Sequence, residues 1–348
     1  MTLSGSYPSS SIYTCLIDKK LDDEEYFSTC CEKAVQDLPK NHCNGHPSFC
    51  DLTYDKFTFP GAHNAGTGQH SSITDCALRN HDLNIREQLD FGLRFFDFDV
   101  IYSHNLANCD GLESGHGKVP DLGLYVCFGS VREIFRQVSE WMVEHPREVV
   151  TLYFGELQYE TETYGYLQSE ILNQFGMEDS LVKLNTRHKT QGGWPTLGEA
   201  IETNQRIFVF IRSELVPPNI PGIIQEVQVT ISKPNLDGPS GSVKILSTFN
   251  SRSIDDNCHA VIDNNKEACP AQSELTKVAV FGTFLNSGLD CIWEIARKCN
   301  PRAMEAIQAC LEFKTNVNFV QVDFPNYPAL SSVQLIDYIH ELNLAKLT

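Results

Sequence analysis

The chain has 348 residues, 41% hydrophobic and 21% charged, which is ordinary for a globular protein that buries a large core. Its formal net charge of −18 opposes binding to nucleic acid and to anionic membrane surfaces. No apolar run approaches the ~20 residues that cross a bilayer. The N-terminal residues MTLSGSYPSS do not have the pattern of a signal peptide, so we expect one to be trimmed or absent here.

Thirteen cysteines concentrate in the first 130 residues and between Cys258 and Cys310, and none has the CxxC spacing of a zinc site. This distribution favours disulfides that staple long loops over metal ligation. We therefore expect an oxidising compartment, so that the protein is secreted or luminal. Because thirteen is odd, at least one thiol is free or paired between chains.

In chain order, residues 1–50 are polar, Cys-rich and irregular, and we expect a disulfide-pinned extension that packs on the rest of the chain. Residues 51–348 show no linker and are expected to form one catalytic domain. Strand-like runs occur at 57–62, 93–99, 112–116, 149–154, 207–211, 244–249, 278–284 and 319–324. Most are continuously apolar, as in a parallel sheet covered on both faces.

Amphipathic helices are predicted between several of these strands, and the clearest is 130–145. The others are 83–91, 196–203, 291–313 with a break at Pro301, and 331–343. Segment 217–242, rich in Pro and Gly, is expected to be a loop. About eight strands interleaved with helices predict an α/β protein with an irregular (β/α)₈, TIM-like barrel, whose active site lies at the C-terminal strand ends. The irregularity is the stretch 99–112, which is too short and polar for a crossover helix.

Polar residues gather where these strands end. FTFPGAHN delivers His63 and Asn64, LESGHG delivers His116, and FFDFDV places Asp97 and Asp99 on one face of a strand. Buried unpaired carboxylates are costly, so the two acids bind a cation or are neutralised by basic side chains. The pattern favours a hard cation, Ca²⁺ with Mg²⁺ as the alternative. Two histidines can act as base and acid near neutral pH, which indicates metal-assisted phosphodiester chemistry.

Three further strand-end residues are candidates. Glu156 is the natural fourth oxygen donor, or a solvated loop residue. Asp323 reaches the same rim from the last strand, either toward substrate or as a loop anchor. Arg212 is the one strand-end cation that the pattern places, and its alternative role is a surface ion pair.

These residues resemble the catalytic X region of phosphatidylinositol-specific phospholipase C and its secreted relatives. The similarity runs from about 57 to 155 and continues weakly through WPTLGEAIETNQRIFVFIR and FVQVDFPNYP. It implies that His63 is the general base and His116 the general acid. It also implies that Asn64, Asp97 and Asp99 are metal ligands, as in the metal-dependent branch of the superfamily.

Two correspondences have alternatives. Strict register places the fourth metal ligand at Gly155 rather than Glu156, and another alignment places the second histidine at Phe128 rather than His116. We prefer His116 because the His-Gly step after a short strand is retained. Under the Phe128 alignment the acid is missing.

The resemblance implies a phosphoric diester hydrolase of the phospholipase C type. We expect a monomer that binds a phospholipid or inositol phosphodiester through Arg212 and Asp323, with transient membrane contact and no nucleic acid partner. The shortage of strand-end cations favours phosphatidylinositol, its glycan-linked form or a lysophospholipid over polyphosphorylated head groups. The alternatives are a glycerophosphodiester or sphingomyelinase D-like phosphodiesterase, and an inactive secreted binding protein on the same barrel.

Overall fold

Eight parallel strands close into a barrel in the computed structural model, which describes residues 41–69, 75–106, 109–117, 125–188, 193–212, 220–233, 236–271, 273–327 and 329–348. In barrel order the strands are β1 (Phe59–Ala62), β2 (Phe95–Leu106), β5 (Val150–Gln158), β6 (Ile207–Arg212), β7 (Ile223–Val229), β8 (Val243–Ser247), β9 (Leu275–Val280) and β10 (Phe319–Val322). Parallel pairing of β1 with both β10 and β2 closes the ring. The predicted barrel is confirmed.

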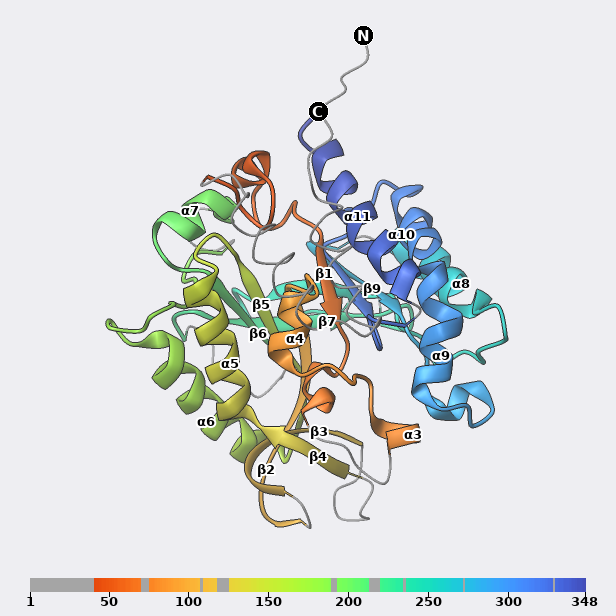
Figure 1. The fold of residues 1–348 in the computed structure, drawn as a ribbon, viewed down its shortest axis with the longest axis horizontal. Helices are drawn as coiled ribbons and strands as arrows, with labels where there is room; N and C mark the ends of the chain where they lie inside the picture. The colour runs from red at the N-terminus through yellow and green to blue at the C-terminus, as the bar shows by residue number, and fades with distance from the viewer. Residues whose placement is uncertain are drawn as a thin grey trace, which may run out of the picture.

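Helices surround the barrel (Figure 1). They are α3 (Asp75–Leu78), α4 (Ile85–Asp90), α5 (Val131–Glu144), α6 (Glu160–Ile171), α7 (Leu197–Glu202), α8 (His259–Ala268), α9 (Ile292–Cys299), α10 (Ala303–Leu311) and α11 (Ala329–Ala345). A π-helical turn, Leu172–Gly176, follows α6, and the short 3-10 turns include Pro47–Asp51, Ala65–Gly68 and Asn300–Arg302. That last turn separates α9 from α10, so the predicted break at Pro301 is confirmed. None of the described helices has the length and apolarity that a bilayer span needs.

Two sequence predictions of strands are corrected. Segment 112–116 belongs to β3 (Cys109–Gly117), which pairs antiparallel with β2 and with β4 (Tyr125–Ser130) and lies outside the barrel. The stretch after Asp99 needs no helix because β2 simply continues into this hairpin. Segment 217–242 was expected to be a loop, but it contains the barrel strand β7, whose IIQEVQV sequence is hidden between Pro- and Gly-rich neighbours.

The barrel interior has an apolar floor below a polar layer. The floor includes Phe59, Phe95 and Phe319, and the Phe95 and Phe319 rings stack with centroids 4.3 Å apart. Alternation along a strand puts every second residue on the same face. Two and four residues after Phe95 and Phe319, the inward positions therefore carry polar side chains. They are Asp97 and Asp99 on β2, and Gln321 and Asp323 on and directly after β10. The site thus forms at the C-terminal strand ends.

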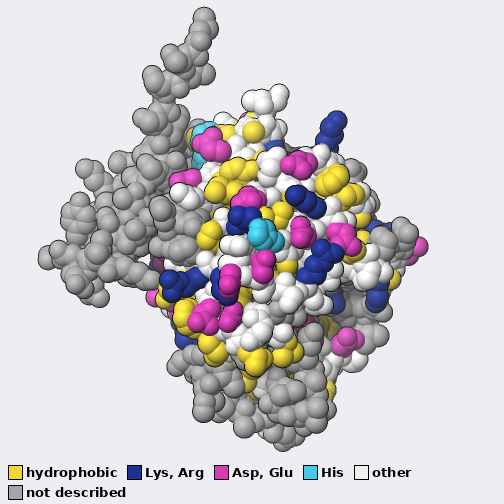
Figure 2. All heavy atoms as spheres, turned by 90° about the vertical axis from the view of Figure 1, so that its right-hand side faces the viewer, with side chains coloured by type: hydrophobic (Ala, Val, Ile, Leu, Met, Phe, Trp, Pro, Cys, Tyr) yellow, Lys and Arg dark blue, Asp and Glu magenta, His cyan; other side chains and the backbone are white. Residues whose placement is uncertain are grey.

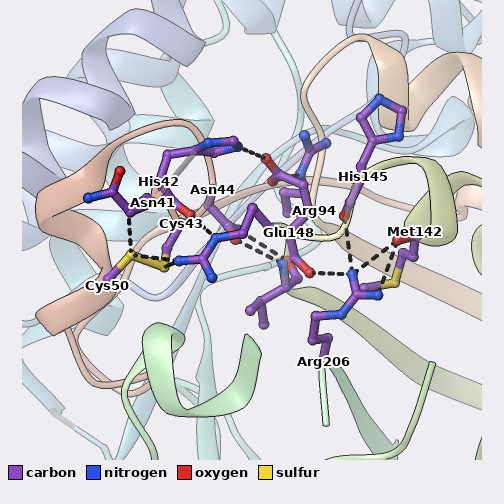
Figure 3. A network of polar contacts seen from close by, with 12 residues as sticks. Asn41, His42, Cys43, Asn44, Cys50, Arg94, Met142, His145, Glu148 and Arg206 are labelled. Atoms are coloured by element: carbon purple, nitrogen blue, oxygen red, sulfur yellow. Dashed lines mark hydrogen bonds and ion pairs between the residues drawn. A yellow bond between two sulfur atoms is a disulfide. The ribbon is translucent and has the colours of Figure 1, made fainter. Parts of the chain in front are cut away.

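Residues 41–44 attach to the end of the barrel at which β2 and β5 begin, and the close view shows their polar contacts (Figure 3). Asn44 accepts from the Val149 amide at 2.8 Å and donates to its carbonyl at 3.1 Å. The Glu148 carboxylate accepts from Arg94 Nε at 2.8 Å, and His42 lies 3.8 Å away. Arg94 directly precedes β2, and Glu148 and Val149 directly precede β5. These contacts therefore stabilise the apolar floor at the N-terminal strand ends, and the polar layer lies at the other end. The predicted boundary at residue 50 stays a prediction, since residues 1–40 lie outside the described chain.

Five disulfides join cysteines of the described residues, so the expectation of cysteine pairing is confirmed. They join Cys43 to Cys50, Cys76 to Cys291, Cys109 to Cys127, Cys258 to Cys299 and Cys269 to Cys310. The remaining cysteines, Cys15, Cys30 and Cys31, lie outside the described residues.

Candidate active site

His63 directly follows β1 and is held from several sides. Its amide donates to the Val322 carbonyl at 3.1 Å, and its ring stacks on Phe281 with centroids 3.7 Å apart. Gly61 allows the close approach of β2, because a Cβ there would lie 2.7 Å from a ring carbon of Phe95. Burial lowers the pKa of His63 to about 4, with Asp97 acting in the opposite direction. The ring is therefore neutral at pH 7 and able to accept a proton.

Asp323 lies behind the His63 ring, with Oδ1 2.9 Å from Nδ1. This carboxyl is 1% exposed, and burial raises its pKa to about 7 while His81 and Asn80 lower it. Burial penalises the charged forms of both partners, so the pair favours one shared proton and no net charge. When Asp323 is ionised it accepts from Nδ1–H, and the lone pair of His63 is then on Nε2.

A second polar layer was not anticipated from the sequence. His81 donates from Nε2 to the His63 carbonyl at 2.6 Å, and burial lowers its pKa to about 4. The side-chain oxygen Oδ1 of Asn80 accepts from Asn64 Nδ2 at 3.4 Å, and the backbone amide of Asn80 donates to Thr67 Oγ1 at 2.9 Å. Asn64 itself has a left-handed backbone with φ of 49° and is buried. The sequence signal for this layer, the polar run RNHD, is not distinguishable from an ordinary loop.

His116 faces His63 from β3. The ring centroids are 6.3 Å apart with planes at 81°, and His116 Nδ1 lies 2.7 Å from the Leu78 carbonyl oxygen. Phe128, the alternative position for the second histidine, is a buried residue that is 1% exposed. The structure therefore brings the preferred pair of histidines together.

A bulge brings Glu156 beside Asp99. The β2–β5 register shifts by one residue, Gly155 is passed over, and Asp99 pairs with Glu156. Gly155 faces the first acid, because a Cβ there would lie 2.6 Å from Asp97 Oδ1. Burial, then Glu156 and Asp97, raise the pKa of Asp99 well above its usual range. Of the two alternative positions for the fourth metal ligand, Gly155 has no side chain and Glu156 places a carboxylate beside Asp99.

The inner acid, Asp97, has a basic partner that the sequence analysis missed. Its Oδ2 accepts from Gln321 Nε2 at 2.5 Å and lies 3.6 Å from Lys277 Nζ. Lys277 is 4% exposed and lies 4.0 Å above the Tyr153 ring. Lys277 lies in the middle of the apolar strand LTKVAV, whereas the sequence prediction rested on residues at strand ends. Asp97 Oδ1 is buried with no hydrogen-bond partner among the described residues.

Arg212 and Glu226 extend the polar layer along β6 and β7, where they pair in register. Glu226 is 3% exposed, and burial raises its pKa to about 7 while Lys277 and Arg212 lower it. The sequence does not point to Glu226, because its strand lies between Pro- and Gly-rich neighbours that predict a loop.

Three of the predicted metal ligands, Asp97, Asp99 and Glu156, lie close enough to influence one another electrostatically, whereas Asn64 contacts Asn80. Within the described chain, however, no three His, Cys, Asp or Glu side chains are arranged as a metal centre. The donor chemistry suits a hard cation, because buried Asp97 Oδ1 lacks a hydrogen-bond partner and neighbouring acids help to raise the pKa of Asp99. The ligand set therefore stays a prediction.

Fold and rim together define an α/β barrel protein with a two-histidine, acid-rich site at the C-terminal ends of its strands. The chain belongs to the PI-PLC X family, whose model (PI-PLC X 1) matches residues 49–234. A PI-PLC X domain-containing protein 1 from Arthroderma benhamiae is 30% identical over 195 residues, which are 55% of this chain and 58% of that protein. An uncharacterized secreted protein from the same organism is 25% identical over 57% of this chain and 42% of its own. The chain thus spans about half the length of these relatives.

Solved structures agree on the fold. The phosphatidylinositol-specific phospholipase C from Listeria monocytogenes superposes with a TM-score of 0.56 at 15% identity, covering 84% of this chain and 97% of that one. The enzyme of the same name from S. aureus gives a TM-score of 0.57 at 16% identity, with 83% and 95% covered. These structures therefore support the barrel fold of this chain. The disulfides and the relative named as secreted are consistent with secretion.

Proposed function

We propose that this protein is a phosphoric diester hydrolase that cleaves a phospholipid or inositol phosphodiester by histidine acid–base catalysis. The observation that carries the proposal is the His63 ring, backed by Asp323, facing His116 at 6.3 Å in the barrel mouth. This arrangement favours an enzyme over an inactive binding protein on the same barrel, because both proton-transfer groups are present and oriented.

The chemistry begins with a substrate hydroxyl next to the phosphodiester. His63 Nε2 takes the hydroxyl proton as that oxygen bonds to phosphorus, and Asp323 stabilises the resulting imidazolium. The His116 imidazolium gives a proton to the lipid oxygen as its bond to phosphorus breaks. The products are a cyclic phosphodiester and a lipid alcohol. Water then opens the ring with the two histidines in exchanged roles.

A Ca²⁺ or Mg²⁺ ion held by Asn64, Asp97, Asp99 and Glu156 is part of the proposal. Such an ion would stabilise negative charge on the phosphoryl oxygens and lower the pKa of the attacking hydroxyl. The excess of acids and the unpartnered Asp97 Oδ1 support it. Lys277, already 3.6 Å from Asp97, supplies one positive charge in the same place.

Exposed apolar residues after β9 support transient contact with a lipid surface. Leu285 is 81% exposed, Leu289 62% and Trp293 38%. They follow Phe281, which comes directly after β9 and stacks on His63, and from this position we place them near the rim of the site. The face that carries α8 to α11 shows acidic, basic and hydrophobic side chains interspersed (Figure 2). A net charge of −18 points to a zwitterionic rather than an anionic surface.

The test is incubation with a panel of radiolabelled phospholipids, with and without a chelator, with both products identified. We expect release of a phosphorylated head group, and His63→Ala and His116→Ala should each lower turnover by roughly 10² to 10⁴ fold without loss of fold. Wild-type turnover in either variant would reject these roles. Phosphate retained on the lipid would favour the sphingomyelinase D-like alternative, and chelator-insensitive turnover would reject the metal. The monomeric state and secretion remain part of the same proposal.

A further inference from the structure

A backbone carbonyl determines which nitrogen of His116 carries the transferable proton. Leu78 ends α3, and its carbonyl is among those that a helix leaves without an internal partner. It lies 2.7 Å from His116 Nδ1. A carbonyl oxygen can only accept, so Nδ1 carries a proton in both the neutral and the charged ring. Nε2 is then the nitrogen that exchanges protons with a substrate.

The helix that supplies this carbonyl is too short to hold itself in place. It has four residues, whereas isolated helices shorter than about 12 residues are marginal in water. On the C-terminal side the chain is fixed by the Asn80 amide, which donates to Thr67 Oγ1 at 2.9 Å. On the N-terminal side the fixed point is Cys76, two residues before Leu78, which is bonded to Cys291.

Cys291 provides a firm anchor. It is the N-cap residue of α9, its amide donates to Glu294 Oε2 at 3.0 Å, and α9 buries Ile292 and Ile295 in the core. A second disulfide, from Cys299 at the end of α9, holds that helix to Cys258. In Figure 1, α3 lies beneath α9 at the lower right of the view, beside the β3–β4 hairpin.

We propose that the Cys76–Cys291 disulfide is a positioning element for the general acid. It keeps the Leu78 carbonyl against His116 and so directs Nε2–H toward the leaving oxygen. This inference rests on the proposed function. Without the bridge the carbonyl moves relative to the ring, the proton distributes over both nitrogens, and protonation of the leaving group becomes less efficient.

The kinetic test uses leaving groups of different basicity. An alkoxide must be protonated as it departs, whereas p-nitrophenolate leaves without help, so only the first reaction depends on the acid. The Cys76→Ala/Cys291→Ala variant should lose about 10 to 10² fold in kcat on an alkyl inositol phosphodiester, with kcat on the p-nitrophenyl ester within about threefold of wild type. The matched control is Cys43→Ala/Cys50→Ala, which removes a disulfide at the opposite end of the barrel and should affect both substrates equally. Equal losses on both substrates, or none, in the Cys76 variant would overturn the proposal.

A spectroscopic test does not depend on turnover. In ¹⁵N-histidine-labelled protein, the His116 ring should show Nδ1 protonation in wild type and in the Cys43 control, and a mixture of tautomers in the Cys76 variant. An unchanged Nδ1-protonated ring in a folded Cys76 variant would overturn the positioning role while leaving the proposed function intact. Absence of turnover by wild type on both esters would reject the proposed function, and the tautomer measurement would still decide the positioning.

Discussion

Replacing Asp323 by Asn tests the electrostatic support of the proposed base. The Oδ1 atom lies 2.9 Å from His63 Nδ1, and the neutral amide can no longer stabilise the imidazolium that forms when His63 takes a proton. Hydrogen bonds to charged groups contribute about 1.5–3 kcal/mol. At about 1.4 kcal/mol per tenfold change in rate, kcat should fall by about 10 to 150 fold.

The pH profile gives this prediction a specific signature. Burial raises the pKa of Asp323 to about 7 and lowers that of His63 to about 4. Above pH 4 His63 is already neutral, so the loss of activity on acidification should follow protonation of the Asp323 carboxylate near pH 7. The pH–rate profile of the Asn variant should lack this acidic limb near pH 7. The raised native pKa of Asp323 makes its own contribution to stability fall as the pH rises from about 4 to 7, and the Asn variant should lack that contribution.

The assay is the steady-state rate on a soluble inositol phosphodiester between pH 5 and 9, with circular dichroism to establish the fold. Asp290→Asn is the matched control, since that carboxylate bonds to Lys298 at 2.7 Å in a half-exposed ion pair. A variant of Asp323 that keeps both the wild-type kcat and the limb near pH 7 would refute the reasoning.

Three other perturbations have defined outcomes. Lys277→Met leaves Asp97 without its buried cation, 3.6 Å away, and should cost about 3–5 kcal/mol of stability at pH 7; a urea midpoint equal to that of wild type would contradict this. Gly155→Ala puts a Cβ 2.6 Å from Asp97 Oδ1, so turnover should drop at least about tenfold while the unfolding temperature changes by only a few degrees; full activity would mean that the bulge does not set the acid geometry. Leu289→Asp should weaken sedimentation with phosphatidylcholine vesicles and leave hydrolysis of a soluble ester unchanged, whereas Leu181→Asp should leave both unchanged, since Leu181 is 68% exposed in the connection before β6. Equal vesicle binding by the two variants would exclude the rim from the lipid contact.

The sequence predicts the barrel well because its strands are buried on both faces and therefore appear as continuous apolar runs. It fails at β7, where IIQEVQV carries Glu226 into the interior, since the polar interior of this barrel breaks the apolar pattern that identifies a strand. The prediction counted β3 among the barrel strands, because the hydrophobic pattern of a strand does not show whether it pairs parallel or antiparallel with its neighbour.

Strand ends are a productive place to look for the site, and His63, His116 and Asp99 were found there. Residues that act from elsewhere were missed. Lys277 lies in mid-strand and reaches Asp97 only because the closed barrel brings β9 opposite β2. The Leu78 carbonyl has no sequence signature at all, since any residue supplies one.

Direct observation of the reaction products by ³¹P NMR tests the central claim, that the two facing histidines carry out phosphoryl transfer to a neighbouring hydroxyl. With phosphatidylinositol dispersed in phosphatidylcholine vesicles, the account predicts a cyclic phosphodiester signal that appears first and is later replaced by a phosphomonoester. A linear phosphomonoester formed from the outset, or a phosphate that stays on the lipid, would contradict it.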